Sequence, residues 1–298
     1  MNIINNQDKT NNTDELINKE ILNKQDVFAC KSVYHELTRV FEEHVQEGIC
    51  VAFSGGVDSS LLLKIACEVG KNANRPILAV TFETKLHPHG DLEEAKAIAS
   101  SLGAVHKVIE VNEFADPEIM HNPVDRCYRC KTLLFQSLIN YATQEGFSYL
   151  VDGSNYDDLK AYRPGMKALK ELGINSPLLA LQITKSQIRS LAAELGIASS
   201  DKPSAPCLAT RLPYGATLDF DLLRRIDLGE HYLRNLGFYN VRLRLHGDIL
   251  RIEVDKKDFS KLIEQEETIL QKLKELGFLY ITLDLEGFRS GSMDINLK

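Results

Sequence analysis

The segment Ser54–Ser59, with the sequence SGGVDS, has the composition of an anion-binding turn. It follows an apolar run at residues 49–53 that predicts a buried strand, and residues 60–66 after it have helical apolar spacing. The first amides of a helix lack intrahelical acceptors and lie at the positive end of its dipole, so they can hold phosphate or pyrophosphate. Glycines let the ligand approach, and hydroxyl groups add donors. The candidate residues are Ser54, Gly55, Gly56, Asp58, Ser59 and Ser60.

The spacing of this motif excludes two other phosphate-binding loops. It contains no GxxxxGK[ST], hence no lysine placed for a transferred γ-phosphate, and no GxGxxG dinucleotide turn. SGGVDS resembles the PP-loop of the ATP pyrophosphatases, a superfamily in which ATP is split to AMP and pyrophosphate while a substrate is adenylated. Asp58 could hold Mg²⁺ or cap the helix, and we expect a role in the ATP site. The alternative is a glycine-rich turn that binds nothing.

Strands and helices alternate on both sides of the motif, which predicts an α/β fold with a parallel sheet covered by helices on both faces. Ligands of such sheets bind beyond the carboxyl ends of the strands. The last strand of this part runs into Gly153, Asp157 and Asp158, so we expect these residues to meet the motif and to help bind the nucleotide. Beyond the motif's own strand and helix, strands are expected at residues 77–82, 105–111 and 149–151, and helices at 33–47, 91–101 and 125–141.

The order of elements changes after two proline-containing segments, residues 202–207 and 213–215. The pattern beyond them predicts helix 219–236, strands 241–246 and 249–254, helix 258–276 and strand 280–285. This order indicates a separate small α+β domain. The expected divisions are a flexible tail at 1–29, a PP-loop domain at 30–210 and a C-terminal domain at 211–298.

Composition limits the classes of function. The chain has 298 residues, 44% of them hydrophobic, which is enough for a full core. A net charge of −7 argues against broad, sequence-independent binding of nucleic acid. No apolar run approaches the roughly 18 residues of a membrane span, and the N-terminus lacks a signal-peptide pattern. Six unevenly spaced cysteines indicate reduced thiols, so we expect a cytoplasmic protein.

Four cysteines lie outside the motif strand and helix, and three of them, all but Cys30 at the edge of the tail, lie in segments rich in polar residues. Cys127 and Cys130 form a CxxC, and Cys207 stands alone. They could belong to a structural zinc site, which would need a fourth ligand, or to a redox pair, which lacks a thioredoxin-like context. They could also hold a [4Fe–4S] cluster with one iron left open. The basic neighbours expected to favour thiolate over thiol are Arg126, Arg129 and Lys131.

Several longer segments resemble the LarE family of ATP-dependent sulfur transferases, which make the nickel-pincer cofactor of lactate racemase. The resemblance implies adenylation of pyridinium-3,5-biscarboxylate mononucleotide and replacement of the activated oxygen by sulfur from a sulfide donor. We also expect a homo-oligomer with no membrane partner. The similarity runs from Gly48 to Val254 and includes FSGGVDSSLLLKIA, RCYRCK, GSNYDD, YRPGMKAL, DKPSAPCLATRLPYG and VRLRLHG.

The family has two branches that differ in the use of cysteine. In one, the cysteine matching Cys207 gives up its own sulfur. In the other, this cysteine joins a CxxC and holds a [4Fe–4S] cluster whose free iron carries the incoming sulfide. Because Cys127, Cys130 and Cys207 are all present, the resemblance implies the cluster branch.

Charged residues of the C-terminal part complete the expected site. Arg242 and Arg244 alternate on one strand face, so both can reach a phosphate, and in the family they line the substrate-phosphate site. Arg211 is a further expected anion contact. Glu230 and Glu253 match family acidic residues near the active site that can bind a divalent metal, although either could be an ordinary surface carboxylate.

Other functions share some of these features. A PP-loop tRNA thiolase also combines the motif with three cysteines, but the acidic charge and the absence of a recognisable RNA-binding module argue against it. An ammonia-using PP-loop enzyme would not need the CxxC. A sulfur or metal carrier regulated by nucleotide is the non-enzymatic alternative.

Overall fold

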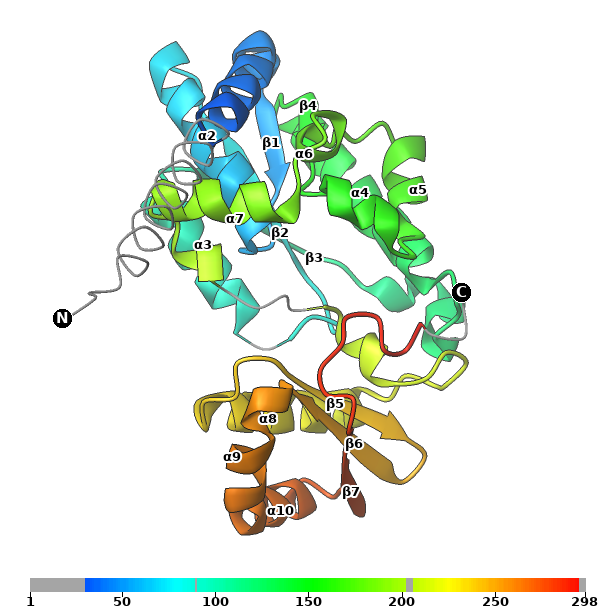
Figure 1. The fold of residues 1–298 in the computed structure, drawn as a ribbon. Coiled ribbons are helices and arrows are strands. Elements are labelled where there is room, and N and C mark those ends of the chain that lie inside the picture. Colours follow the sequence, from blue (N-terminus) through cyan, green and yellow to red (C-terminus); the bar gives the residue numbers. More distant parts are fainter. Residues whose placement is uncertain (1–29, 89, 202–205, 295–298) are drawn as a thin grey trace, which may run out of the picture.

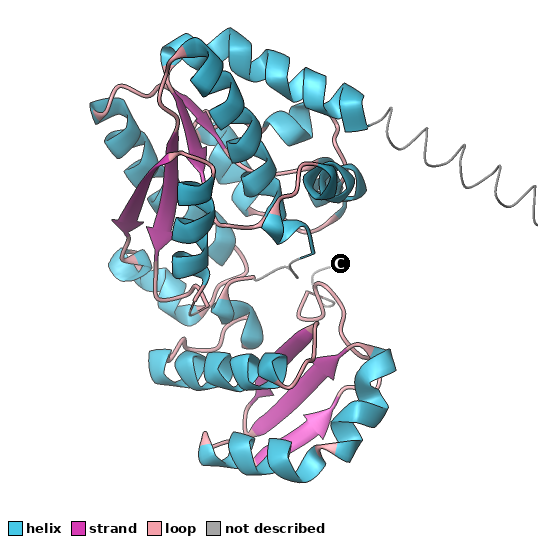
Figure 2. Cartoon of the chain, turned by 90° about the vertical axis from the view of Figure 1, so that its left-hand side faces the viewer, coloured by secondary structure: helices cyan, strands magenta, loops and turns pink. Residues whose placement is uncertain are grey.

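The structure is a computed structural model that describes residues 30–88, 90–201 and 206–294 (Figure 1). The expected tail at 1–29 and part of the proline-containing segment at 202–207 lie outside the described residues. The described chain forms two sheets, one of four strands and one of three, in separate parts of the molecule (Figure 2).

The first sheet is parallel throughout, with the strand order β3-β2-β1-β4. Its central strand carries the motif at its carboxyl end, and its residue Val51 pairs with Ala79 on one side and Val151 on the other. Parallel strands with short apolar sequences are typical of sheets buried on both faces. The strands are β1 (Ile49–Ala52), β2 (Leu78–Glu83), β3 (Val105–Glu110) and β4 (Tyr149–Val151).

Helices cover both faces of this sheet, which confirms the predicted α/β class. Along β1, Ile49 and Val51 pack into one core while Cys50 packs into the other, because successive side chains of a strand point to opposite faces. The first core takes residues from the helix at 30–44, α2 (Val57–Ala73), α3 (Asp91–Ser101), α6 (Pro177–Ala180) and α7 (Lys185–Glu194). The second takes residues from α4 (Arg126–Gln144) and α5 (Gly165–Glu171).

The second sheet has the order β5-β6-β7, antiparallel between the first two strands and parallel between the last two. One expected helix, residues 258–276, is divided at Gln265 into two, and both helices bury leucine or isoleucine in the same core. The elements are α8 (Phe220–Asn235), β5 (Val241–His246), β6 (Ile249–Val254), α9 (Phe259–Glu264), α10 (Glu266–Glu275) and β7 (Tyr280–Leu283).

The two parts of the molecule pack against each other. Leu86 and Ile119, from loops beyond the first sheet, belong to the core of the second part, and the Leu208 amide donates to the Leu86 carbonyl at 2.8 Å. The residues after β7, drawn red in Figure 1, run back from the small sheet toward the first part. The expected boundary between residues 210 and 211 therefore stays a prediction.

Candidate functional site

The motif turn (Ser54–Ser59) joins β1 to α2, as its sequence predicts. Gly55 has φ +72°, a left-handed conformation that favours glycine, and a Cβ there would lie 3.3 Å from the Ala95 Cα. Gly56 is the N-cap of α2, without a side-chain cap. The Ser59 hydroxyl donates to the Gly56 carbonyl at 3.1 Å and accepts from the Ser54 amide at 3.3 Å. Ser59 thus closes the turn, so the helix start keeps one compact conformation.

The loop after β4 meets this turn. A Cβ on Gly153 would lie 3.2 Å from both the Asp58 Cβ and the Ser59 amide nitrogen. Only glycine lets the two loops approach so closely. The carboxyl ends of two neighbouring strands therefore form one edge, where the fold class places ligands.

Asp58 places a half-buried carboxylate at this edge. Its Oδ2 atom lies 2.6 Å from the Lys185 Nζ, whereas its Oδ1 atom is buried with no hydrogen-bond partner among the described residues. Burial raises the pKa of Asp58, and the Lys185 ammonium group opposes that shift. A carboxylate oxygen without a partner is suited to a cation or a donor brought by a ligand.

Lys185 is a functional candidate that the sequence-based reasoning missed. It is the first residue of α7, behind the N-cap Thr184, whose side chain forms a capping box with Gln187. The Lys185 amide donates to the Asp157 Oδ2 at 2.8 Å, and its ammonium group reaches Asp58. The Thr-x-x-Gln pattern would have located this helix start in the sequence.

Asp157 and Asp158 both lie in the short 3-10 helix Tyr156–Lys160, and both have hydrogen-bond or ion-pair partners. Asp158 Oδ2 accepts from the Asn155 amide at 3.0 Å, and its Oδ1 pairs with Arg163 at 2.9 Å. Asp157 accepts from Lys160 and from the Lys185 amide. These contacts hold the loop and Lys185 in place beside Asp58.

The three cysteines lie near one another. Cys127 and Cys130 are one turn apart at the start of α4, so their side chains share a face, and Cys207 precedes the 3-10 helix Leu208–Arg211. All six cysteines of the chain are free. Burial raises the pKa of Cys130, and negative charge on Cys207 and Cys127 raises it further. Cys130 and Cys207 also pack against the same hydrophobic core, so two segments far apart in sequence bring these cysteines near one another. We call Cys127, Cys130 and Cys207 the three-cysteine site.

Two of the three basic neighbours of the CxxC, Arg129 and Lys131, pair with carboxylates instead of the thiols. Arg129 is tied to Asp116 and Asp125, and the Lys131 Nζ lies 3.7 Å from the Asp152 Oδ2 at the end of β4. Only Arg126 contacts a thiol, with its Nη2 3.8 Å from the Cys127 Sγ. Burial also raises the pKa of Cys207, so two of the three cysteines favour thiol.

The donor set of the three-cysteine site suits an iron–sulfur cluster rather than a single metal ion. Within residues 30–88, 90–201 and 206–294, no three His, Cys, Asp or Glu side chains are arranged to hold a metal ion. Three thiols on two segments are nevertheless the ligands that an iron–sulfur cluster with one open iron requires.

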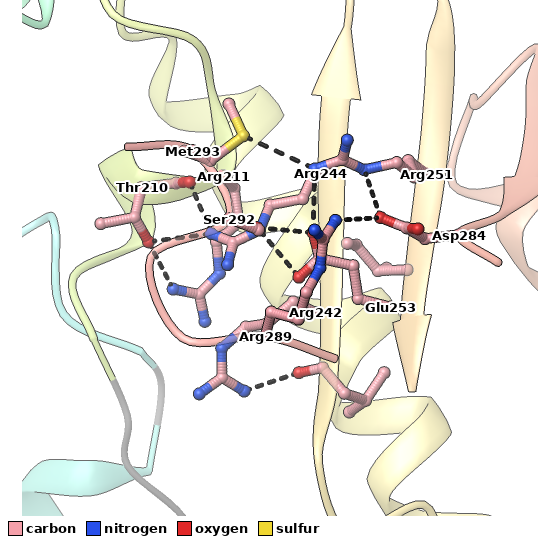
Figure 3. Close-up of polar contacts among 12 residues, drawn as sticks. Thr210, Arg211, Arg242, Arg244, Arg251, Glu253, Asp284, Arg289, Ser292 and Met293 are labelled. Carbon is pink, nitrogen blue, oxygen red and sulfur yellow. Dashed lines mark hydrogen bonds and ion pairs between the residues drawn. The ribbon is translucent and has the colours of Figure 1, made fainter. Parts of the chain in front are cut away.

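The second sheet carries charge on one face. Arg242 pairs with Glu253, and Arg244 pairs with Arg251, so all four side chains point to the same side of β5 and β6. We call these four residues the arginine face. Figure 3 shows Arg244 and Arg251 on the two strands, with Ser292 and Met293 of the C-terminal segment against them.

Both carboxylates that were predicted to bind a divalent metal already accept hydrogen bonds from protein groups. Glu253 accepts from Arg244 at 3.3 Å, from Arg251 at 2.9 Å and from the Ser292 hydroxyl at 2.6 Å. Glu230 accepts two bonds of 2.8 Å from Arg211 and one of 3.0 Å from the Leu243 amide. A divalent cation would have to displace an arginine from either carboxylate.

Arg211 also fixes the segment that carries Cys207. Its Nη1 donates to the carbonyls of Pro206 and Cys207 at 2.7 and 3.2 Å, and its side chain is 1% exposed. Arg211 therefore connects the buried Glu230 to the three-cysteine site, rather than pointing freely toward an anion.

Arg242 is the arginine whose charge the surroundings support least. Burial lowers its pKa to about 10, and the positive charges of Arg211 and Arg244 add to the shift. Its guanidinium lies 5.3 Å from the centre of the Phe288 ring. An anion bound here would offset the repulsion among these groups.

The C-terminal segment supplies contacts that the sequence-based reasoning missed. Phe288 donates its amide to Val254 at 2.8 Å, and Arg289 lies 3.4 Å from Asp284. At its end, Asp294 accepts from the Tyr214 hydroxyl at 2.8 Å, and the Tyr214 ring lies 5.9 Å from the Arg126 guanidinium. The segment thus links the arginine face to the three-cysteine site.

Comparison with known proteins agrees with this arrangement. The PP-loop domain family matches residues 30–121. A protein of Synechocystis, described as uncharacterized, is 40% identical over 82% of this chain and 91% of its own length. The pyridinium-3,5-bisthiocarboxylic acid mononucleotide synthase of Lactiplantibacillus plantarum is 36% identical over 84% of this chain and 90% of its own length. A tRNA-specific 2-thiouridylase of Rickettsia bellii is 29% identical over 54% of this chain and 53% of its own length.

None of the helices in the described part of the chain is both long and apolar enough to cross a membrane. The resemblance seen in the motifs is confirmed, since the identity to the L. plantarum synthase extends over most of both chains. The chain belongs to the LarE family of PP-loop sulfur transferases.

Proposed function

We propose that the protein is an ATP-dependent sulfur transferase that converts a carboxylate of pyridinium-3,5-biscarboxylate mononucleotide into a thiocarboxylate. The observation that carries the proposal is the meeting of three thiols from two segments in a chain with a PP-loop. The name of the L. plantarum relative supports the choice of substrate. Lys131, next to Cys130, reaches Asp152 beside Gly153, which connects the thiols to the nucleotide edge.

The first step is adenylation at the motif turn. The substrate carboxylate attacks the α-phosphorus of ATP, and the bond to pyrophosphate breaks. This activation is needed because a free carboxylate oxygen is a poor leaving group, whereas AMP is a good one. The amides at the start of α2 stabilise charge on the departing pyrophosphate. Lys185 adds a positive charge, and Asp58 and its unpartnered oxygen are placed for Mg²⁺.

The second step exchanges oxygen for sulfur. Hydrosulfide attacks the acyl carbon, AMP leaves with the carboxyl oxygen, and one proton is released. Cys127, Cys130 and Cys207 would hold a [4Fe–4S] cluster, which supplies an open iron for the incoming sulfide. Arg126 contributes positive charge beside these thiols.

The arginine face would hold the substrate's phosphate. Arg242 and Arg244 lie two residues apart on β5, and a phosphate dianion would relieve the unfavourable field at Arg242. We assign the divalent metal to Asp58, since Glu230 and Glu253 already bind arginines.

The wider setting is part of the same proposal. We propose that the product serves nickel-pincer cofactor synthesis in the cytoplasm, where ATP is available and cysteines stay reduced. We further propose a separate sulfide donor and a homo-oligomeric assembly.

The test is anaerobic reconstitution with iron and sulfide, followed by an assay of pyrophosphate and thiocarboxylate over several turnovers. We expect pyrophosphate release to require the pyridinium substrate, and thiocarboxylate to exceed one equivalent per chain. Cys127→Ala should abolish multiple turnover, whereas Cys67→Ala, which removes a half-buried thiol of α2, should not.

Two results would contradict the proposal in different ways. Multiple turnover by Cys127→Ala without a cluster would remove the cluster assignment. A wild-type enzyme that stops after one turnover, with Cys207 converted to dehydroalanine, would instead establish transfer of its own sulfur.

Thiolation of tRNA is a second candidate, favoured by the partial identity to the Rickettsia thiouridylase. The similarity covers only about half of each chain, and the net charge of −7 does not suit a polyanion. Copurifying tRNA, with pyrophosphate release that depends on it, would favour this candidate.

A further inference from the structure

Asn122 occupies an unusual position just before α4. It ends the 3-10 helix Pro117–His121 with φ +47°, and it is fully buried. The left-handed region is rare for residues other than glycine, and asparagine is among the few that tolerate it. A buried amide side chain must also find partners for its oxygen and its two N–H groups. Both the backbone and the side chain therefore specify asparagine here.

The Asn122 nitrogen binds the segment that follows Cys207. Its Nδ2 lies 2.7 Å from the carbonyl oxygen of Pro213, 3.3 Å from that of Leu212 and 3.5 Å from that of Ala209. The Asn122 carbonyl accepts from the Gly215 amide at 3.0 Å. One residue thus satisfies several backbone groups of a loop about 90 positions away.

The Asn122 oxygen faces the CxxC. It accepts a hydrogen bond from the Arg126 Nη1, while the Nη2 of the same guanidinium reaches the Cys127 Sγ. Arg126 is 2% exposed, and no carboxylate pairs with it among the residues that the structure describes. The amide group of Asn122 therefore joins the two segments that carry the cysteines.

We propose that Asn122 is a positioning residue that holds the Cys207 segment against the Cys127–Cys130 turn. This inference rests on the proposed role of the three cysteines. Arg211, within the same segment, binds the carbonyls of Pro206 and Cys207 and anchors them to Glu230. The spacing of the thiols then depends on both sets of contacts, and loss of the Asn122 amide removes one of them.

The test compares the same substitution at two left-handed asparagines. Asn122→Gly keeps the backbone conformation and removes the amide, and Asn74→Gly does the same at an exposed helix end with φ +53°. Supporting groups around metal ligands commonly change affinity by 10- to 100-fold. We expect Asn122→Gly to bind iron at least about tenfold more weakly after anaerobic reconstitution, and Asn74→Gly to match wild type.

A second measurement does not need the cluster. Alkylation of Cys207 by iodoacetamide, followed by mass spectrometry, should be about tenfold faster in Asn122→Gly than in wild type or Asn74→Gly. Asn122→Asp keeps the acceptor for Arg126 but turns an oxygen toward the loop carbonyls, so it should behave like the glycine variant. If the wild type neither binds iron nor releases pyrophosphate, the proposed function fails while the alkylation rates still test Asn122.

Pyrophosphate release separates positioning from general loss of structure. The ratio of sulfur transfer to pyrophosphate release should fall at least about tenfold in both Asn122 variants. Unchanged Cys207 alkylation in Asn122→Gly would overturn the inference. Equal loss of pyrophosphate release and sulfur transfer in both variants would also overturn it, because Asn122 would then serve the fold as a whole.

Discussion

The motif turn and the arginine face would bind anions by different physical means. The motif turn uses the amides at a helix start, with Lys185 as the nearby side-chain cation. The arginine face uses buried guanidinium groups that repel one another and are only partly neutralised by Glu253 and Glu230. Backbone dipoles cost little stability when no ligand is bound. Buried side-chain charges do cost stability, and that cost is recovered only when an anion binds.

Each region also contains one charge that the folded state disfavours. Burial raises the pKa of Asp58 in the first region and lowers the pKa of Arg242 in the second. Asp58 is therefore poised for a cation and Arg242 for an anion. We therefore expect that neutralising either residue stabilises the fold and weakens function. Breaking an ion pair in which both charges are already neutralised should instead destabilise the fold.

We expect the largest effect on the free energy of unfolding from substituting Arg211, which forms a buried ion pair with Glu230. Arg211→Ala leaves the fully buried Glu230 without its two-bond partner, and breaking such a buried pair costs about 3–5 kcal/mol. Urea denaturation should show a free energy of unfolding lower by this amount. Arg39→Ala, in an exposed pair with Glu43, should cost no more than about 1 kcal/mol. Similar losses for the two variants would show that burial does not distinguish the pairs.

Asp58→Asn tests the disfavoured charge of the motif turn. Because the folded pKa lies above that of the unfolded chain, the folded state binds more protons, and wild-type stability falls as pH rises from 3.8 through the raised folded pKa. At pH 7 the neutral amide should therefore raise the urea midpoint. Pyrophosphate release should fall about 100-fold, because the cation loses its carboxylate. A lower midpoint at pH 7 would mean that the Lys185 pair outweighs the burial of Asp58.

Arg242→Met makes the corresponding test on the arginine face. The folded pKa of about 10 lies below the ordinary value of arginine, so the penalty on the charged form is fully present at pH 7 and is relieved only as pH rises above about 10. The apolar side chain should raise the free energy of unfolding at pH 7. Calorimetric binding of a pyridine mononucleotide should weaken about tenfold or more, since a charge-assisted hydrogen bond is lost.

The control for Arg242→Met is Arg224→Met, on an exposed position of α8. It removes the same charge from the same domain, so equal loss of mononucleotide binding in both variants would indicate a long-range effect of net charge. Binding unaffected by Arg242→Met would place the phosphate elsewhere.

The sequence predicted features that depend on local pattern. The period of apolar residues placed β5 and β6 at the observed bounds, and the glycines of the motif turn placed it between β1 and α2. Local patterns do not show which charged side chains contact one another in the folded protein. Arg129 was expected to act on the thiols, yet Asp116 and Asp125 bind it instead.

The functional candidates that the sequence did not predict lie at contacts between segments far apart in the chain. The segment with α5, α6 and α7 was left unassigned, so Lys185 could not be placed beside Asp58. Asn122 and the loop at Pro213 are neighbours only because the two parts pack together. The spacing of apolar residues does not predict such a contact, although the capping box at Thr184 does indicate where α7 begins.

The smallest expected effect concerns the C-terminal segment that joins the arginine face to the three-cysteine site. Tyr214→Phe removes the hydroxyl bound to Asp294 and keeps the ring beside Arg126, so it should cost about 1 kcal/mol or less in global stability. Hydrogen exchange should nevertheless quicken in residues 288–294, because the hydroxyl bond ties down the end of this segment. Tyr280→Phe, at an exposed tyrosine of β7, serves as the control. If the two variants exchange alike in this segment, the link through Asp294 does not couple the two regions.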